Sequence, residues 1–162
     1  SGGLIECIIE GMPAGVGDPV FDKLDASLAK AVMSIGAVKG VEIGDGFSVT
    51  SSKGSINNDS FISENGQVLK QTNHSGGILG GISDGSSIIL RAAIKPTPSI
   101  SQPQKTVNTA GENIEIAISG RHDPVIVPRA VVVVESMAAI TLTDLLMQNM
   151  TSRIEHLKNI YL

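Results

Sequence analysis

The sequence predicts an α+β fold in which a few helices accompany short strands. Three features lead to this prediction. Residues 4–44 have the pattern of a strand, a helix and a second strand, and residues 114–118 alternate between apolar and polar side chains. Residues 127–150 are apolar on nearly all sides, which indicates a helix buried between layers. At 162 residues the chain has the length of one domain.

The opening segment predicts its elements in order. Residues 4–9 are a continuous apolar run typical of a buried strand. Asp18 and Pro19 are typical of the N-cap and first position of a helix, and Gly36 is placed to end that helix in a left-handed turn. Residues 37–44 then predict a second strand. The apolar stripe expected on the helix consists of Phe21, Leu24, Leu28, Val32 and Ile35.

The rest of the chain is less regular. Residues 44–87 accumulate Gly, Ser, Asn and Asp and predict long surface loops with little regular structure. Residues 87–95 predict a third strand, which a proline-rich stretch then ends, and residues 114–118 predict a strand with one buried face. After the apolar helix of residues 127–150, Ser152 and an acidic residue three positions later have the spacing of a capping box and predict a short last helix.

Composition excludes several classes of function. The net charge of -4 argues against a nucleic-acid surface, which needs excess Lys and Arg. The longest apolar run, Ala130–Leu142, is shorter than the roughly 20 residues that span a bilayer, so no membrane partner is expected. The single cysteine, Cys7, lies in an apolar run and is expected to be a small buried thiol. A cytoplasmic location is therefore expected.

A glycine turn near the start resembles a dinucleotide-binding fingerprint only superficially. Gly15 and Gly17 lie between a strand and a helix, where phosphates commonly bind. Val20 stands in place of the third glycine, and Asp18 would set a negative charge against a phosphate. The segment is therefore interpreted as a structural turn.

Two further segments are suited to an anionic ligand. Residues 73–83 hold four glycines, which suit either a close backbone approach to a ligand or a flexible turn, and composition leaves both open. His74 within this segment has no partner at metal-ligand spacing. Residues 95–100 place Lys95 before a proline-stiffened turn with hydroxyls, which suits a phosphate, although Lys95 is equally typical of a solvated strand end.

The densest chemistry lies at residues 120–124. Arg121 is suited to clamp an anion, and His122 and Asp123 are adjacent titratable groups. An ordinary charged turn would have the same composition, so both interpretations stay open. Arg129 is expected to pair with Glu135, with another acid or with a ligand, because an unpaired buried guanidinium would be costly.

These segments together resemble a known family. Residues 13–47, 73–83, 95–100 and 120–130 resemble, in order and spacing, the second half of chorismate synthase, and the likeness extends from Gly2 to Met147. The resemblance implies a sandwich with helices between antiparallel sheets, incomplete in this chain, so that residues 1–162 are the carboxyl-terminal part of a single domain. It also implies a homotetramer that binds reduced flavin mononucleotide (FMN).

The reaction implied by the resemblance is the 1,4-elimination of phosphate from 5-enolpyruvylshikimate 3-phosphate, which gives chorismate with no net redox change. Asp123 matches the aspartate that assists proton transfer. The positions that match flavin-contacting residues are Gly36, Ala37, Gly80, Lys95, Pro96, Thr97, Pro98, Ser99 and Arg121. The sequence departs from the family pattern at Pro98, Val125 and Val133, where serine, cysteine and proline are usual, and these changes leave the charged groups intact.

The family's catalytic histidines and its amino-terminal arginine cluster belong to a half that does not match any segment here. The chain alone is therefore expected to be inactive and to need that amino-terminal half of the same chain as its partner. The alternatives are a noncatalytic module that binds a flavin or phosphate ligand, and an assembly piece whose apolar helix faces seek the missing half. A pyridine-dinucleotide oxidoreductase is the least favoured alternative, because the fingerprint is broken.

Overall fold

The computed structural model describes residues 1–120 and 123–161, and its centre is one three-stranded antiparallel sheet. The strand order is β1 (Gly3–Ile9), β7 (Ile88–Ile94) and β2 (Val38–Ile43). β7 is central because both β1 and β2 pair with it, and its side chains alternate between a buried face and a more exposed one. This alternation is the period-2 pattern of a strand with a helix layer on one side.

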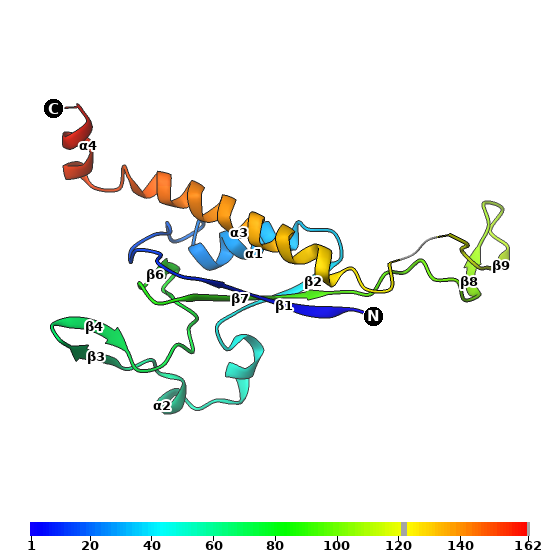
Figure 1. The fold of residues 1–162 in the computed structure, drawn as a ribbon, viewed down its shortest axis with the longest axis horizontal. Helices are drawn as coiled ribbons and strands as arrows, with labels where there is room; N and C mark the ends of the chain where they lie inside the picture. Colours follow the sequence, from blue (N-terminus) through cyan, green and yellow to red (C-terminus); the bar gives the residue numbers. More distant parts are fainter. Residues whose placement is uncertain (121–122, 162) are drawn as a thin grey trace.

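Two helices cover one face of this sheet (Figure 1). α1 (Leu24–Met33) and α3 (Val127–Asn149) pack against each other, α1 also contacts β2, and α3 also contacts β1. The core between helices and sheet contains no aromatic side chain among the described residues and depends on aliphatic packing. Its fully buried large members are Val16, Leu24, Leu28, Val32, Ile88, Leu90 and Val134.

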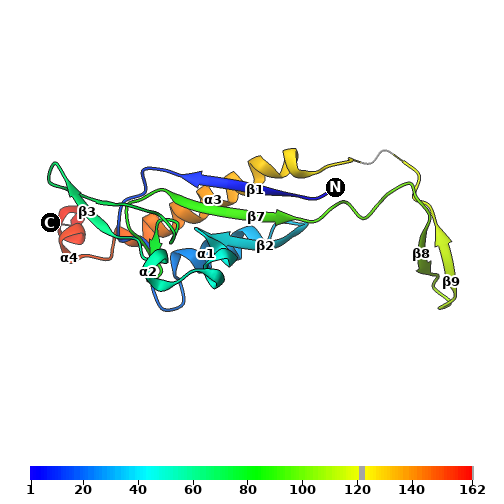
Figure 2. The same cartoon turned by 90° about the horizontal axis from the view of Figure 1, so that it is seen from below.

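Smaller elements surround the sheet. They are η1 (Gly46–Ser51), α2 (Gly54–Asn57), β3 (Phe61–Glu64), β4 (Gln67–Lys70), β5 (Ile78–Leu79), β6 (Ile82–Ser83), β8 (Gln104–Val107), β9 (Asn113–Ile116) and α4 (Ile154–Tyr161). The strands form three antiparallel hairpins, β3–β4, β5–β6 and β8–β9. Figures 1 and 2 show the β8–β9 hairpin projecting beyond the end of the sheet where β1 begins, whereas α4 lies at the opposite end.

The α+β class is confirmed, but the start of the first helix is wrong. Asp18 and Pro19 do not begin it; α1 begins at Leu24, whose N–H donates to the carbonyl of Gly81 at 2.8 Å. The intervening turn is held by two backbone hydrogen bonds between residues 18 and 22. Phe21 is consequently 91% exposed instead of lying on the buried stripe.

The end of this helix also differs from the prediction. Gly36 does not adopt the left-handed conformation; Ala37 does, with φ of 73°. A non-glycine residue in this region is uncommon and costs free energy, so the turn from α1 into β2 is strained at Ala37.

The prediction of little regular structure in residues 44–87 is wrong as well. This segment contains the β3–β4 and β5–β6 hairpins and two short helical turns. The β5–β6 hairpin is difficult to predict because its strands are two residues long and its turn consists of Gly80 and Gly81. The β3–β4 turn is Asn65–Gly66, with positive φ at both residues, which is the turn type that favours a hairpin.

The strand expected at residues 114–118 is only partly confirmed. β9 ends at Ile116, and its four residues are exposed on both faces, so the predicted buried face is wrong. Its partner β8 begins at Gln104, directly after the proline-rich stretch. Apolar alternation predicted the strand correctly, but none of the described residues covers either of its faces.

The long apolar helix is confirmed, whereas its burial on all sides is wrong. One stripe of α3 is buried, and the outer side remains exposed, as Val132 and Ile140 show. By length and composition α3 is also long and apolar enough to cross a membrane. The sequence analysis had expected otherwise, because it considered only the shorter apolar run Ala130–Leu142. The core helix of a protein passes the same test, and within this chain one stripe of α3 packs against α1 and β1 while most of the helix is exposed.

The first strand is confirmed as a strand but not as a fully buried one. β1 is an edge strand in which Ile5 is buried and Leu4 and Ile8 are exposed. Cys7 is half-buried, and desolvation by burial together with the nearby Glu135 raises the pKa of its thiol. A raised pKa keeps the thiol protonated, which agrees with the expected unreactive cysteine.

Candidate functional site

Several of the predicted ligand-binding segments meet at one end of the sheet. β7 ends at Ile94, which pairs with Gly3 of β1 and with Val38 of β2, so the residues just beyond these positions are neighbours. The N–H of Lys95 donates to the carbonyl of Ala37 at 2.9 Å. The turn of residues 36–37 and the loop of residues 95–99 therefore lie side by side, although 58 positions separate Ala37 from Lys95 (95 minus 37).

The turn is open to solvent. Gly36 is exposed, and a methyl group built on it would meet no atom within 4 Å. A flat ligand can therefore approach this turn closely.

The loop of residues 95–99 has the features of an anion site. Lys95, Pro96 and Pro98 are exposed, and the two prolines fix the backbone at little further entropic cost. The Thr97 hydroxyl oxygen is buried and has no hydrogen-bond partner among the described residues. Buried hydroxyls are normally hydrogen-bonded, so this hydroxyl is available to a ligand that can accept a hydrogen bond. A phosphate accepting from Thr97 and attracted by Lys95 fits the site, because it supplies both an acceptor and a negative charge.

Asp123 lies at the same end of the sheet. The nitrogen of Ser1, which precedes β1, donates to the carbonyl of Pro124 at 2.9 Å. The Asp123 carboxylate accepts from Nη1 of Arg129 at 2.6 Å, so Arg129 pairs with this acid and not with Glu135. Asp123 is half-buried, which leaves one side of the carboxylate accessible. Arg121, the remaining predicted anion clamp, lies outside the described residues.

We call Gly36, Ala37, the loop 95–99 and Asp123 the sheet-end site. Its composition is a cation, an orphan hydroxyl, a strained turn and a carboxylate fixed by an arginine. The cation and the hydroxyl can hold a phosphorylated ligand, and the carboxylate can accept or donate a proton. A site that binds a cofactor and uses an acid–base group beside it needs both kinds of group.

Gly80 does not belong to the sheet-end site within this chain. It is exposed in the β5–β6 turn, whose neighbour Gly81 accepts from the N–H of Leu24 at the start of α1. The turn of residues 36–37 follows the other end of the same helix. A helix of ten residues rises about 15 Å, so Gly80 and the sheet-end site lie at opposite ends of α1.

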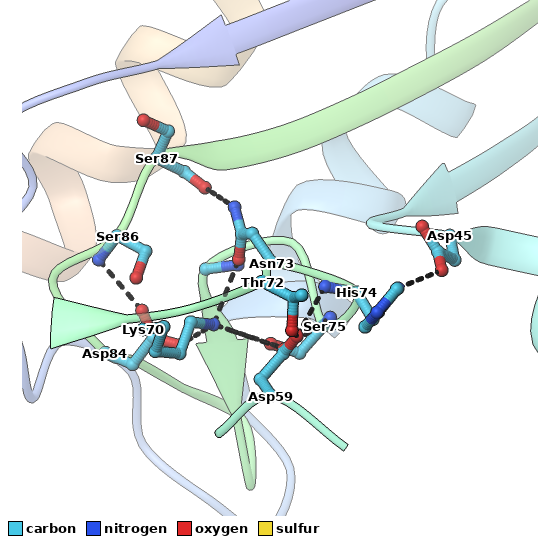
Figure 3. A network of polar contacts seen from close by, with 11 residues as sticks. Asp45, Asp59, Lys70, Thr72, Asn73, His74, Ser75, Asp84, Ser86 and Ser87 are labelled. Carbon is cyan, nitrogen blue, oxygen red and sulfur yellow. Dashed lines mark hydrogen bonds and ion pairs between the residues drawn. The ribbon is translucent and has the colours of Figure 1, made fainter. Parts of the chain in front are cut away.

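A buried ion network was missed by the sequence analysis (Figure 3). The ammonium of Lys70 contacts Asp84 at 2.7 Å, Ser75 at 2.9 Å, Asn73 at 3.0 Å and Asp59 at 3.4 Å. The side chains of Lys70 and Asp59 are each 4% exposed. Lysine and aspartate are rarely buried to this extent unless they are paired, so the network is a specific feature of the fold.

Both acids of this network are held in the charged form. Burial by itself would raise the pKa of Asp59, but hydrogen bonds from Ser75, Thr72 and the His74 N–H outweigh burial and hold the pKa well below its ordinary value. For Asp84, burial also acts to raise the pKa, and Lys70 and Ser86 more than offset it, so the pKa is lowered. Hydrogen bonds to the charged form stabilise it against loss of solvent.

No local spacing in the sequence could have revealed this network, because its members come from three separate elements. The only available signal was the unusual length of an apparently irregular segment rich in Asp, Asn and Ser. His74 lies at its edge, where its Nδ1 contacts the Asp45 carboxylate at 2.6 Å. Among residues 1–120 and 123–161, no group of His, Cys, Asp or Glu is arranged to hold a metal ion.

Two amides of the Gly15–Gly17 turn are already bonded within the fold and are not free to bind a dinucleotide phosphate. The Gly15 N–H donates to the Ser83 carbonyl at 2.8 Å, and the Val16 N–H donates to the Ser83 hydroxyl at 2.9 Å. Both amides are used to hold β6, as expected for a structural turn.

A groove of about 680 Å³ lies between α1 and the preceding turn on one side and α3 on the other. It is lined by charged and apolar side chains, including Phe21, Lys30, Ile140 and Asp144. The groove is therefore an uncovered part of the helix layer, and it does not contain any of the residues predicted to bind a ligand.

Comparison with known proteins gives one consistent result. A family model described as chorismate synthase matches residues 1–147. The chorismate synthase of Lachnoclostridium phytofermentans is 68% identical over 162 residues, and that of Agathobacter rectalis is 64% identical over 161 residues; each match covers 99% of this chain and 44% of the relative. The chorismate synthase of Archaeoglobus fulgidus is 57% identical over 154 residues, covering 94% of this chain and 43% of the relative.

A solved structure agrees with the sequence matches. A crystal structure of chorismate synthase superposes with a TM-score of 0.73 at 33% identity, covering 98% of this chain and 41% of the other. The chain thus spans less than half the length of the relatives that it matches, in their carboxyl-terminal part.

Proposed function

Because this chain belongs to the chorismate synthase family, we propose that it forms the carboxyl-terminal part of an enzyme that eliminates phosphate from 5-enolpyruvylshikimate 3-phosphate to give chorismate. The observation that carries this proposal is the sheet-end site, where the orphan hydroxyl of Thr97 and the ammonium-bearing Lys95 lie beside the turn of residues 36–37. These groups suit the phosphate of reduced FMN.

The residues of the chain have distinct roles in this proposal. Lys95 and Thr97 hold the phosphate of the flavin, and the open turn at Gly36 and Ala37 admits its ring system. When bound, reduced FMN supplies an electron-rich ring that assists the loss of the substrate phosphate. Asp123, oriented by Arg129, receives or returns a proton at its carboxylate oxygen.

The reaction balances without an external oxidant. The bond between the phosphate oxygen and carbon 3 and the bond between carbon 6 and its hydrogen both break, and a second ring double bond forms. Two products leave, chorismate and inorganic phosphate, together with a proton. The protein therefore needs to hold two anionic molecules and manage one proton, which matches the cations and the carboxylate at the sheet-end site.

We also propose that the complete protein is a homotetramer in the cytoplasm. Support for assembly comes from the many large apolar side chains that stay exposed in this chain, among them Phe21, Phe47 and Phe61. Exposed apolar surface on this scale favours burial by other parts of the protein or by other copies.

The proposal is tested with a joined enzyme, in which the amino-terminal part of the Lachnoclostridium phytofermentans relative precedes this chain. Anaerobic assays with reduced FMN and 5-enolpyruvylshikimate 3-phosphate should detect chorismate from the joined enzyme and none from the 162-residue chain alone. A joined enzyme that binds FMN and substrate but forms no chorismate would contradict the assigned activity. Turnover by the chain alone would show that essential catalytic groups lie within it.

A further inference from the structure

The ammonium of Lys70 closes a loop by binding both of its ends. Asn73 and Ser75 stand at the start of the segment 73–84, and Asp84 stands at its end. All three contact the same ammonium, whose side chain is 4% exposed. The β5–β6 turn, which carries Gly80, lies between these ends.

The network continues from the ammonium into the backbone of the loop. The Asn73 side-chain oxygen, which accepts from Lys70, also accepts from the Gly77 N–H at 2.8 Å. The Asn73 amide nitrogen donates to the carbonyl of Ser87 at 2.8 Å, immediately before β7. One side chain thus connects the buried cation, the glycine backbone and the central sheet.

Backbone hydrogen bonds also hold the segment, because the Leu24 N–H donates to Gly81 and the Ser83 N–H donates to Val16, and Ile78 packs in the core. Gly76, Gly77, Gly80 and Gly81 all have positive φ, and glycine loses more conformational freedom on ordering than any other residue. The β5–β6 ladder joins only two residue pairs. A cation that binds oxygens from both ends of the segment therefore adds to these contacts and limits the conformational freedom of the glycines between them.

The charges around Lys70 are satisfied without a second cation. Asp59 carries the additional negative charge and accepts hydrogen bonds from the Ser75 N–H at 2.9 Å and the His74 N–H at 2.7 Å. The Thr72 hydroxyl donates to it at 2.8 Å. Asp59 therefore fixes the chain just before and within the loop, and the compact ammonium of Lys70 lies where oxygens of four side chains converge.

We propose that Lys70 is a positioning residue for flavin binding: by clamping the ends of the segment 73–84, it holds Gly80 in the conformation that contacts the cofactor. This inference rests on the proposed function and, for the contact of Gly80 with flavin, on the family resemblance, because Gly80 lies at the opposite end of α1 from the sheet-end site of the same chain. Lys70 itself touches no ligand in this proposal and acts only through the loop.

The test compares Lys70→Met with Lys53→Met in the joined enzyme. Lys53 is an exposed lysine outside the network and provides the matched control. Amide hydrogen exchange of the segment 73–84 is measured without FMN, and FMN affinity is measured by flavin fluorescence. Lys70→Met should accelerate exchange in the segment and weaken FMN binding by about ten-fold or more, whereas Lys53→Met should change neither.

If Lys70→Met does not fold, Ser75→Ala tests the same point, because it removes one oxygen from the ammonium and leaves both ion pairs intact. It should accelerate exchange within the segment 73–84 and weaken FMN binding to a smaller degree. The proposal is overturned if the folded variant binds FMN as tightly as the unaltered enzyme, or if the segment exchanges at an unchanged rate. An unaltered joined enzyme that does not bind FMN would instead overturn the proposed function, and the exchange data would still decide whether Lys70 holds the loop.

Discussion

Replacing Gly44 with alanine should detach the glycine-rich loop from the sheet. Gly44 follows β2 and has φ of +58°. A methyl group on it would overlap the carbonyl oxygen of His74 and would lie 2.6 Å from the Gly76 nitrogen and 2.7 Å from the Ser75 carbonyl carbon. These neighbours are backbone atoms, so no side-chain rotation can relieve the overlap.

The expected cost has two parts. Alanine in the left-handed region costs roughly 1–2 kcal/mol relative to glycine. Overpacking against a rigid neighbour adds typically about 1–3 kcal/mol, because ordinary carbon contacts are longer than these distances. Gly66 isolates the first part, since it also has positive φ, +79°, and a methyl group on it would meet no atom within 4 Å. The difference between Gly44→Ala and Gly66→Ala should therefore be about 1–3 kcal/mol.

Hydrogen exchange at Asp45 measures this difference locally. The Asp45 N–H donates to the His74 carbonyl at 2.8 Å, so its protection reports whether the loop stays against β2. Gly44→Ala should accelerate exchange at Asp45 by about 5- to 150-fold relative to Gly66→Ala in the joined enzyme, which corresponds to about 1–3 kcal/mol. If the Asp45 amide exchanges at the same rate in the two variants, the conclusion that the backbone of Gly76 packs too closely against Gly44 to admit a side chain is refuted.

Three further predictions concern the charged and polar groups. The pKa values of Asp59 and Asp84 are lowered in the fold, so the stabilising contribution of these carboxylates is fully present above the unfolded pKa of about 3.9 and should be lost as pH falls below it. The melting temperature should therefore decline in that acid range, and Asp59→Asn should make the decline shallower. Thr97→Val should leave stability without FMN unchanged or raise it by up to about 1–3 kcal/mol, since it removes an unsatisfied buried hydroxyl, while FMN affinity should fall. Arg129→Gln should slow chorismate formation and leave FMN affinity unchanged, because the Asp123 carboxylate loses the side chain that orients it, and Arg129→Lys should retain part of the activity.

Each of these predictions has an opposing result. An unchanged acid decline in Asp59→Asn would mean that other carboxylates set the pH dependence. A Thr97→Val variant that binds FMN normally would remove the hydroxyl from the proposed phosphate site. An Arg129→Gln variant with unchanged activity would mean that Arg129 does not act through Asp123.

The sequence predicted those strands and helices whose position depends on nearby residues alone. The strand at residues 87–95 was located to within one residue at each end, because a short apolar run followed by prolines is a strong signal. The long helix was located because apolar residues fill a continuous span. The start of α1 was wrong because it is fixed by a hydrogen bond from Leu24 to Gly81, 57 positions away along the chain (81 minus 24), which no local pattern encodes.

The candidate site divides in the same way. The loop 95–99 lies beside Ala37 because β7 and β2 pair in antiparallel orientation. The sequence predicted both strands but did not show that they pair with each other. The Lys70 network was missed because its carboxylates lie 11 positions before and 14 positions after the lysine. Burial, which turns these ordinary polar residues into a clamp, is a property of the tertiary structure.

The exposed side of α3 explains why an apolar helix was wrongly predicted to be buried on all sides. An apolar side chain at every helical position requires that each face be covered, but it does not specify which segment covers it. α1 and β1 cover one stripe, and Val132, Ile140 and Met147 remain exposed. Since the relatives are more than twice as long as the matched segment, their remaining length is sufficient to cover the other faces. The exposed apolar faces of this chain therefore support a role as one part of a larger enzyme instead of an independent binding module.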